Sequence, residues 1–304
     1  MTHLKSLRIK GGILAARARD TWIPASPQKI RTVLALCGDR YVSAEKIAQV
    51  IVGDYGLTFK LFRLMNSAFF SIQRKDLLSV RYMVVLLGLE NLARAASKTH
   101  VAVLKKKRNL SEDIHLFFIA QGIFASRLAS ALASHLKVDQ EKASVMAMFR
   151  NLGDVISALT VPDIVISTCR DFSLVIDERR FKRSCGGYTP ERLGLRLARN
   201  WNMPYLIRLV ICPSGFNLKE VGGEEKRLFI LSDLTRELIV TGLSKGKGMK
   251  RIRIFKRSVA EKLDVEEKTM DSALLEAGKE IRHNDSLFSP LLESQGLLDR
   301  LLDG

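Results

Sequence analysis

The sequence predicts an all-α protein built as a multi-helix bundle, and three observations support this fold class. Apolar residues recur at intervals of three and four along most of the chain, as in Leu57, Leu61 and Leu64, which is the spacing of one face of an amphipathic helix. Strict two-residue alternation is rare, and the alternating segment Arg251–Phe255 is too short and isolated to build a sheet. The chain of 304 residues is 47% hydrophobic, so it can bury a sizeable core.

The first three helices are expected in the segment that follows two prolines. The prolines of Pro24–Pro27 suit turn and first-turn positions ahead of a helix that ends at Gly38. Ser43 is expected to cap a second helix, because its side-chain oxygen can accept an N–H group of the first turn, and Gly53 ends that helix. The segment Asp54–Ser67 is expected to form the third helix.

Three longer helical stretches follow. Ser79–Leu104 is largely apolar, and Gly88 is expected to divide it into two helices. Ser111–Leu136 is expected to form a long helix with Ser111 as its cap, and its small residues would let other helices approach closely. Asp139–Leu159, with Asp139 as its cap, is expected to form one helix.

A change of composition suggests the domain organisation. Proline and glycine concentrate in Cys212–Lys226, so this segment is the candidate linker. We therefore expect a helical domain over residues 20–214 and a C-terminal helical extension over residues 215–304, which would pack on the first domain.

The chain is strongly basic, with a formal net charge of +17, so an acidic partner must be considered. Lys and Arg cluster in three segments: Lys105–Arg108, Arg179–Arg183 and Lys245–Arg257. In the last of these, seven of thirteen positions are basic. A solvated loop or helix face is the simplest interpretation of such a run, and contact with an anionic ligand, a lipid or a nucleic acid is the alternative.

The nucleic-acid alternative depends on Lys250, Arg251 and Arg253 in the longest basic segment. These side chains could contact phosphates. Aromatic residues among them are limited to Phe255, so the segment does not resemble a stacking platform for single strands.

The sequence gives no sign of secretion, membrane insertion or metal-binding cysteines. The first thirty residues carry several charges, and we find no apolar run that approaches the roughly 20 residues of a membrane span. The four cysteines lie far apart, without a C-x-x-C pair. They are expected to be ordinary thiols of a cytoplasmic protein.

Several motifs resemble one family of helical modules. The segment Lys46–Phe70, KIAQVIVGDYGLTFKLFRLMNSAFF, together with Leu86–Leu92 (LLGLENL), Ile23–Pro27 (IPASP) and Leu193–Pro204, resembles the HDOD family, whose members are related to HD-type phosphohydrolases. The resemblance covers roughly Trp22–Ser214. It implies an HD-like helical bundle and a role in bacterial intracellular signalling.

The resemblance also implies where an HD enzyme would hold its metal ions. The His-Asp pair of such an enzyme falls at Arg150 and Asn151, the first His falls near Phe117, and the last acidic ligand falls near Pro213 or Ser214. A guanidinium has no lone pair to give, and a neutral amide is a weak substitute for a carboxylate. All four expected ligands are therefore replaced, and we expect no metal, no cofactor and no enzymatic activity.

Neighbouring residues do not restore such a site. His115 is two positions from Phe117, which on a helix turns it by about 200°. Asp154 alone cannot form a metal site, since such sites need several oxygen or nitrogen ligands.

Polar residues inside the matched region have two interpretations each. Arg150 could bind a phosphate or carboxylate of a ligand through its forked guanidinium, or pair with a carboxylate of the protein, and the internal pair is favoured. Lys60 and Arg63 are expected to be solvated, with partner contact as the alternative. Asn66 and Ser67 are expected to end one helix and cap the next segment.

The function predicted from the sequence is a non-catalytic signal-transduction module that binds a protein or a small anionic partner. Recognition would use a groove or apolar patch near the motif helix, with a few buried anchors providing the affinity. Two alternatives stay open: a divergent metal-dependent nucleotide or cyclic-dinucleotide phosphohydrolase, and a nucleic-acid-binding regulator that uses the basic C-terminal segment.

Overall fold

The computed structural model describes residues 9–66, 77–103, 110–169, 174–243, 249–284, 287–294 and 296–303. These ranges consist of α-helices, two short 3-10 turns and connecting segments. Within them there is no strand, and β-pairing is limited to two isolated bridges, Ala25 with Val101 and Cys169 with Ile176. The predicted all-α fold is confirmed.

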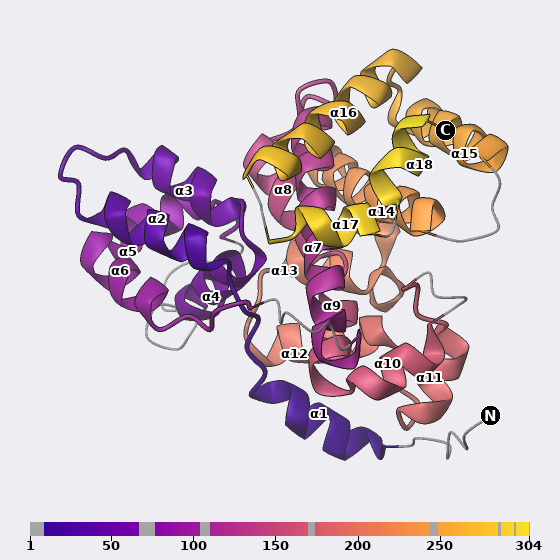
Figure 1. Cartoon of the computed structure of the whole chain (residues 1–304), viewed down its shortest axis with the longest axis horizontal. Coiled ribbons are helices and arrows are strands. Elements are labelled where there is room, and N and C mark those ends of the chain that lie inside the picture. Colours follow the sequence, from indigo (N-terminus) through magenta and orange to yellow (C-terminus); the bar gives the residue numbers. More distant parts are fainter. Residues whose placement is uncertain are drawn as a thin grey trace.

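The helices after the first prolines form a lobe at one side of the molecule (Figure 1). They are α2 (Pro27–Cys37), α3 (Ala44–Val52), α4 (Tyr55–Met65), α5 (Val80–Leu87) and α6 (Leu89–Ser97). Ser43 accepts a hydrogen bond from the backbone N of Lys46 at 3.2 Å, as expected of a cap. Gly88 separates α5 from α6 with a φ of 74°, which glycine adopts without strain.

Asp54 ties the motif helix α4 to the start of α2. Its side chain is fully buried, and its carboxylate accepts the N–H of Leu57 and the N–H of Ser26, each at 2.8 Å. Asn66 ends α4 at a φ of −94° and donates to the carbonyl of Phe62. It therefore closes the helix without the left-handed conformation, while the expected role of Ser67 falls outside the described residues.

The long helix α7 (Leu110–Ala133) runs through the centre of the molecule (Figure 1). It contacts α8 and α9 and also α14, α16 and α17 near the C-terminus. It begins at Leu110, so Ser111 lies within the helix and not at the expected cap position. An apolar stretch of α7, Asp113–Ala133, is long and apolar enough to span a membrane, contrary to expectation, but 83% of its 18-residue window is buried by other parts of the protein. This burial is typical of a core helix.

The segment Asp139–Leu159 forms two helices, and the expected single helix is wrong. Asp139 caps α8 (Gln140–Phe149) by accepting the N–H of Lys142 at 2.8 Å. The chain then turns at Arg150 and Asn151 before α9 (Leu152–Thr160) begins. Both turn residues make side-chain bonds to other helices, which are described below, and these bonds stabilise the break.

The helices between α9 and the candidate linker lie toward α1 at one end of the molecule, with the last of them, α13, nearer the centre (Figure 1). They are α10 (Pro162–Thr168), α11 (Glu178–Ser184), α12 (Pro190–Asn200) and α13 (Tyr205–Ile211), with α1 (Gly11–Arg19) packed on α12 and α9. The candidate linker contains two 3-10 turns, Pro213–Gly215 and Leu218–Glu220.

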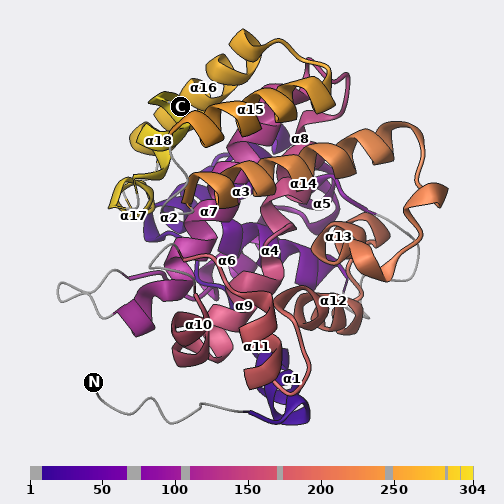
Figure 2. The same ribbon diagram turned by 90° about the vertical axis from the view of Figure 1, so that its right-hand side faces the viewer.

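The C-terminal part is helical, as expected. It consists of α14 (Gly223–Leu243), α15 (Met249–Leu263), α16 (Glu267–Asn284), α17 (Ser289–Ser294) and α18 (Leu297–Asp303). Figure 2 shows α14 between α13 and α15, and α14 also packs on α7 and α8. Buried apolar residues from both sides of residue 214 belong to one continuous core, and the alternating segment Arg251–Phe255 lies in α15.

The crossing of α9 and α12 depends on a glycine. A Cβ atom on Gly153 would lie 2.2 Å from the carbonyl oxygen of Pro190, which belongs to backbone and cannot swing away. We expect Gly153→Ala to lower the free energy of unfolding by about 1–3 kcal/mol, because overpacking forces the helices apart. Urea unfolding followed by circular dichroism measures this.

Gly12→Ala is the matched control. Gly12 lies in α1, and a Cβ atom there would meet no atom within 4 Å. Its unfolding free energy should be unchanged or higher by up to about 1 kcal/mol, since alanine favours a helix. Equal stability of the two variants would contradict the close crossing.

Candidate functional site

The turn between α8 and α9 places a buried arginine among carboxylates from two other helices. The Arg150 side chain is 7% exposed. Its Nη1 lies 2.8 Å from Oε1 of Glu191 on α12, and its Nε and Nη2 each lie 2.8 Å from Oδ1 of Asp233 on α14. Arg150 therefore pairs with carboxylates of the protein itself, which is the interpretation that the sequence favoured. Both carboxylates are distant from Arg150 in the sequence.

The Asn151 side chain is bonded to α7 and α4. Its Nδ2 donates to the carbonyl of Phe118 at 2.7 Å, and its Oδ1 accepts the hydroxyl of Tyr55 at 3.2 Å. Burial, with a smaller contribution from the charge of Asp154, raises the pKa of Tyr55 well above its usual value. The hydroxyl therefore stays protonated and serves as a donor to Asn151.

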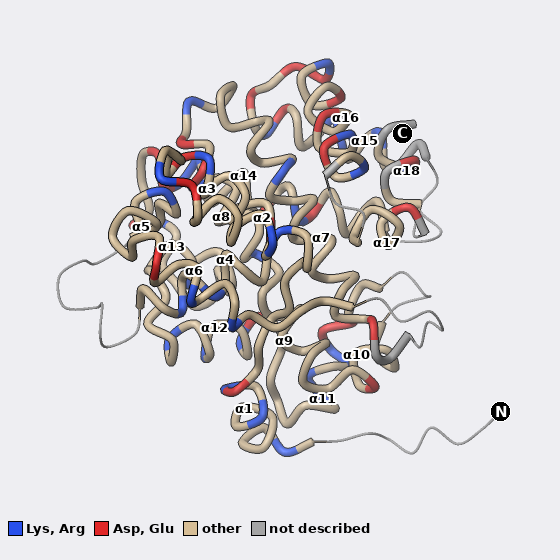
Figure 3. The backbone as a smooth tube through the Cα atoms, turned by 60° about the vertical axis from the view of Figure 1, so that its left-hand side comes forward, with Lys and Arg blue, Asp and Glu red and all other residues tan. Residues whose placement is uncertain are grey.

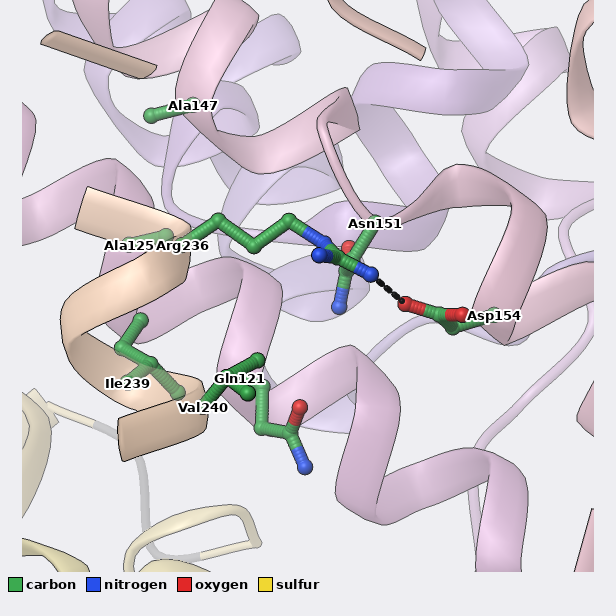
Figure 4. Close-up of a pocket in the computed structure, with 8 residues that line it drawn as sticks. All are labelled: Gln121, Ala125, Ala147, Asn151, Asp154, Arg236, Ile239 and Val240. Carbon is green, nitrogen blue, oxygen red and sulfur yellow. Dashed lines mark hydrogen bonds and ion pairs between the residues drawn. The ribbon is translucent and has the colours of Figure 1, made fainter. Parts of the chain in front are cut away.

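A second ion pair lies beside Asn151. Figure 4 shows the Arg236 side chain reaching from α14 past Asn151 to Asp154, whose Oδ2 lies 3.0 Å from the guanidinium Nη2. Burial lowers the pKa of Arg236, but the charges of Asp154, Glu191 and Asp233 outweigh it, so the net pKa is raised. This guanidinium is therefore charged at any physiological pH.

The space around this pair is small. A cavity of about 20 Å³, lined in part by Gln121, Asn151, Asp154 and Arg236, has room for about one water molecule. Among the described residues, the buried Nε of Arg236 has no hydrogen-bond partner. This N–H group could donate a hydrogen bond to a water molecule in the cavity.

The cluster around the α8–α9 turn, which we call the turn cluster, joins three segments of the chain: the turn with the start of α9, α12 and α14. Its members are Arg150, Asn151, Asp154, Glu191, Asp233 and Arg236. Each of its carboxylates contacts a guanidinium. In the part of the chain that the structure describes, no group of three or more His, Cys, Asp and Glu side chains is arranged to hold a metal ion. Chemically, the cluster is suited to holding helices together.

Two other positions of the implied ligand set lie elsewhere. Phe117 is buried in α7, and Ser214 lies in the 3-10 turn Pro213–Gly215, where its hydroxyl is 3.5 Å from Sγ of Cys212. Neither contributes a side-chain bond to the turn cluster among the described contacts. Glu191, Asp233 and Arg236 were not predicted, since nothing in their local sequence indicates a partner 41 to 83 positions away.

A second feature lies at the surface of the motif helix. Trp22 is 39% exposed, stacks on His100 with ring centroids 5.6 Å apart, and has Lys60 Nζ and Arg63 Cζ at 4.2 Å and 4.4 Å from its ring centroid. Burial, and then neighbouring positive charge, lowers the pKa of Lys60. We call Trp22, Lys60, Arg63 and His100 the tryptophan patch. Its cations are held against an aromatic face and are not simply solvated.

The basic C-terminal segment is partly neutralised. Lys256 lies 2.8 Å from Asp271, and Arg257 lies 2.9 Å from Glu267. Lys250 and Arg251 belong to α15 by their backbone, but their side chains are outside the described part of the structure, and Arg253 is exposed. The structure does not bring these residues together with Arg150 and Asn151.

Comparison with known proteins identifies relatives of the sequence and of the fold. Residues 23–212 match the sequence model of the HDOD domain. The MmoQ response regulator from Methylococcus capsulatus str. Bath is similar in structure, with a TM-score of 0.60, 17% identity, and coverage of 84% of this chain and 98% of that chain. A virulence factor (cj0248) from Campylobacter jejuni subsp. jejuni is similar with a TM-score of 0.60, 16% identity, and coverage of 89% and 96%. No curated protein matches.

Arg150→Met tests the turn cluster. It would remove the guanidinium that is hydrogen-bonded to Glu191 and Asp233 and leave Arg236 as the nearby positive charge. We therefore expect a loss of about 2–3 kcal/mol in unfolding free energy, which is less than for a fully enclosed pair because both carboxylates are partly exposed. Arg150→Lys should lose less, since one ammonium retains the charge but cannot bridge both carboxylates as a fork. Chemical denaturation gives both values.

Arg94→Met provides the control, because Arg94 pairs with Glu90 at the surface. Removing an exposed pair should change stability by less than about 1 kcal/mol. If Arg150→Met were as stable as Arg94→Met, the turn cluster would not hold the helices together.

Proposed function

The chain belongs to the HDOD domain family, as its motif residues predicted, and from this premise we propose that it is a non-catalytic regulatory module of cytoplasmic signal transduction that acts by binding a protein partner. The observation that carries the proposal is the state of Arg150 and Asn151. These residues stand where the family resemblance places the His-Asp pair of an HD enzyme, and both are buried and fully engaged with protein groups.

The geometry of the turn cluster supports a structural role for the former catalytic region. The carboxylates of Asp154, Glu191 and Asp233 all face guanidinium groups, so their lone pairs are used in charge-assisted hydrogen bonds. The Arg236 guanidinium places a positive charge beside Asn151, which the family resemblance puts at the position of a metal ligand in an HD enzyme.

We place the partner-binding surface at the tryptophan patch. Tryptophan and arginine are the residue types most enriched among the energetic centres of protein interfaces. Here the Trp22 ring contacts His100, Lys60 and Arg63, so little side-chain freedom would be lost on binding. The net positive charge of the patch suits an acidic segment of the partner.

Trp22→Ala tests this surface. In affinity capture from cells that naturally express the chain, we expect the amount of captured partner to fall at least about tenfold. A residue at the energetic centre of an interface contributes more than about 1.4 kcal/mol to the binding free energy, and losing this much weakens binding tenfold. Quantitative mass spectrometry of the eluates measures the change.

Tyr41→Ala is the matched control, since Tyr41 is an aromatic side chain that is 97% exposed and lies outside the tryptophan patch. The same partner should be retained by this variant. Equal retention by Trp22→Ala would place the binding surface elsewhere.

Metal analysis tests the non-catalytic part of the proposal. The full chain, produced in medium supplemented with manganese and iron, should contain far less than one transition-metal ion per molecule, because the ligand positions carry a guanidinium and an amide. Hydrolysis of a phosphodiester test substrate should equal the background rate. A stoichiometric metal together with hydrolysis that is lost in Arg150→Ala would show that the protein is an enzyme.

A further inference from the structure

A pocket of about 430 Å³ lies outside the turn cluster, on the exposed side of α12. One wall is formed by α12 and the preceding Tyr188, and the other by the 3-10 turn Pro213–Gly215 with Cys212. Its lining residues are Tyr188, Arg192, Leu195, Arg196, Arg199, Asn200, Cys212, Ser214 and Gly215. We call it the arginine pocket.

Three arginines share the face of α12 that borders the pocket. Arg192, Arg196 and Arg199 are spaced by four and three positions, so they project from the same side of the helix, and all three are exposed. Figure 3 shows the basic positions along α12 in blue. The opposite face of the helix, with Leu193 and Leu197, is buried in the core. The charges are therefore presented outward together.

These arginines differ from those of the turn cluster in their pairing. Among the described residues, none of the three forms an ion pair, and the pocket lining contains no Asp or Glu. Arg196 donates to the hydroxyl of Tyr188 and lies over its ring, which orients the guanidinium without neutralising it. The nearby carboxylate of Glu191 is already paired with Arg150.

We propose that the arginine pocket binds a small molecule that carries two linked phosphate groups. Guanidinium forks bind phosphate oxygens in pairs, and like charges on successive helical turns repel one another until an anion is bound. Arg192 and Arg199 are seven positions apart on α12, roughly 10 Å along the axis, so the arginines can contact more than one anionic group. The hydroxyls of Tyr188 and Ser214 line the same space and add hydrogen-bonding groups.

The shape of the pocket favours a small ligand over a nucleic-acid strand. Its volume falls within the roughly 300–1,000 Å³ typical of small-molecule sites. Tyr188 is the single aromatic residue in its lining, whereas proteins that bind single strands present several aromatic surfaces for stacking. This pocket shares no lining residue with the tryptophan patch, so the proposal goes beyond the proposed function and does not depend on it.

Calorimetric titration of the full chain with inorganic pyrophosphate tests the proposal. We expect saturable binding by the wild type and at least about tenfold weaker binding by the double variant Arg192→Gln/Arg199→Gln, since two charge-assisted contacts are removed. Orthophosphate should bind more weakly than pyrophosphate. A wild type that shows no saturable binding at millimolar pyrophosphate would overturn the proposal.

The double variant Arg31→Gln/Arg40→Gln is the matched control, because both arginines are exposed, lie outside the pocket and remove the same net charge. It should bind pyrophosphate within about twofold of the wild type. Equal weakening by both double variants would show a general charge effect and contradict a defined site. Tighter binding of a single-stranded oligonucleotide that also depends on Arg192 and Arg199 would assign the pocket to nucleic acid and overturn the small-ligand proposal.

Discussion

The burial of the Arg150 guanidinium is the constraint on which the arrangement of the later helices depends. A buried cation is costly unless carboxylates accompany it, and no carboxylate close in sequence is used. Glu191 must come from α12 and Asp233 from α14. The same turn directs Asn151 to the carbonyl of Phe118 and the hydroxyl of Tyr55, so one pair of residues positions helices from the N-terminal lobe, the centre and the C-terminal part.

Arginine has opposite roles in two neighbouring regions of this protein. Inside, Arg150 and Arg236 are matched by carboxylates, and their forks connect helices. On the outer face of α12, Arg192, Arg196 and Arg199 have no described carboxylate partner and border an open pocket. Net charge alone does not distinguish these roles, because paired arginines contribute to stability and unpaired ones remain able to bind an anion. The net charge of the chain therefore indicates an anion-binding site only when it is known which arginines have carboxylate partners.

Local signals in the sequence predicted what local interactions determine. The caps at Ser43 and Asp139 and the break at Gly88 follow from hydrogen bonds and backbone angles within a few residues. The break at Arg150 was not predicted, because the apolar pattern continues from α8 into α9 and the interactions that stabilise the turn come from other helices. Arg236 was missed for the same reason: its partner Asp154 is 82 positions away. The family motif pointed to Arg150 and Asn151, and the structure added Glu191, Asp233 and Arg236.

The position of α14 has a consequence for how much of the chain is needed to fold. The family match ends at residue 212, before the helix that supplies Asp233 and Arg236. A polypeptide cut at that boundary would retain Arg150 with one carboxylate fewer, retain Asp154 without its cation, and expose the apolar surfaces of α7 and α8 that α14 covers. We therefore expect the smallest part of the chain that folds alone to extend through Leu243 at least, beyond the region recognised by sequence similarity.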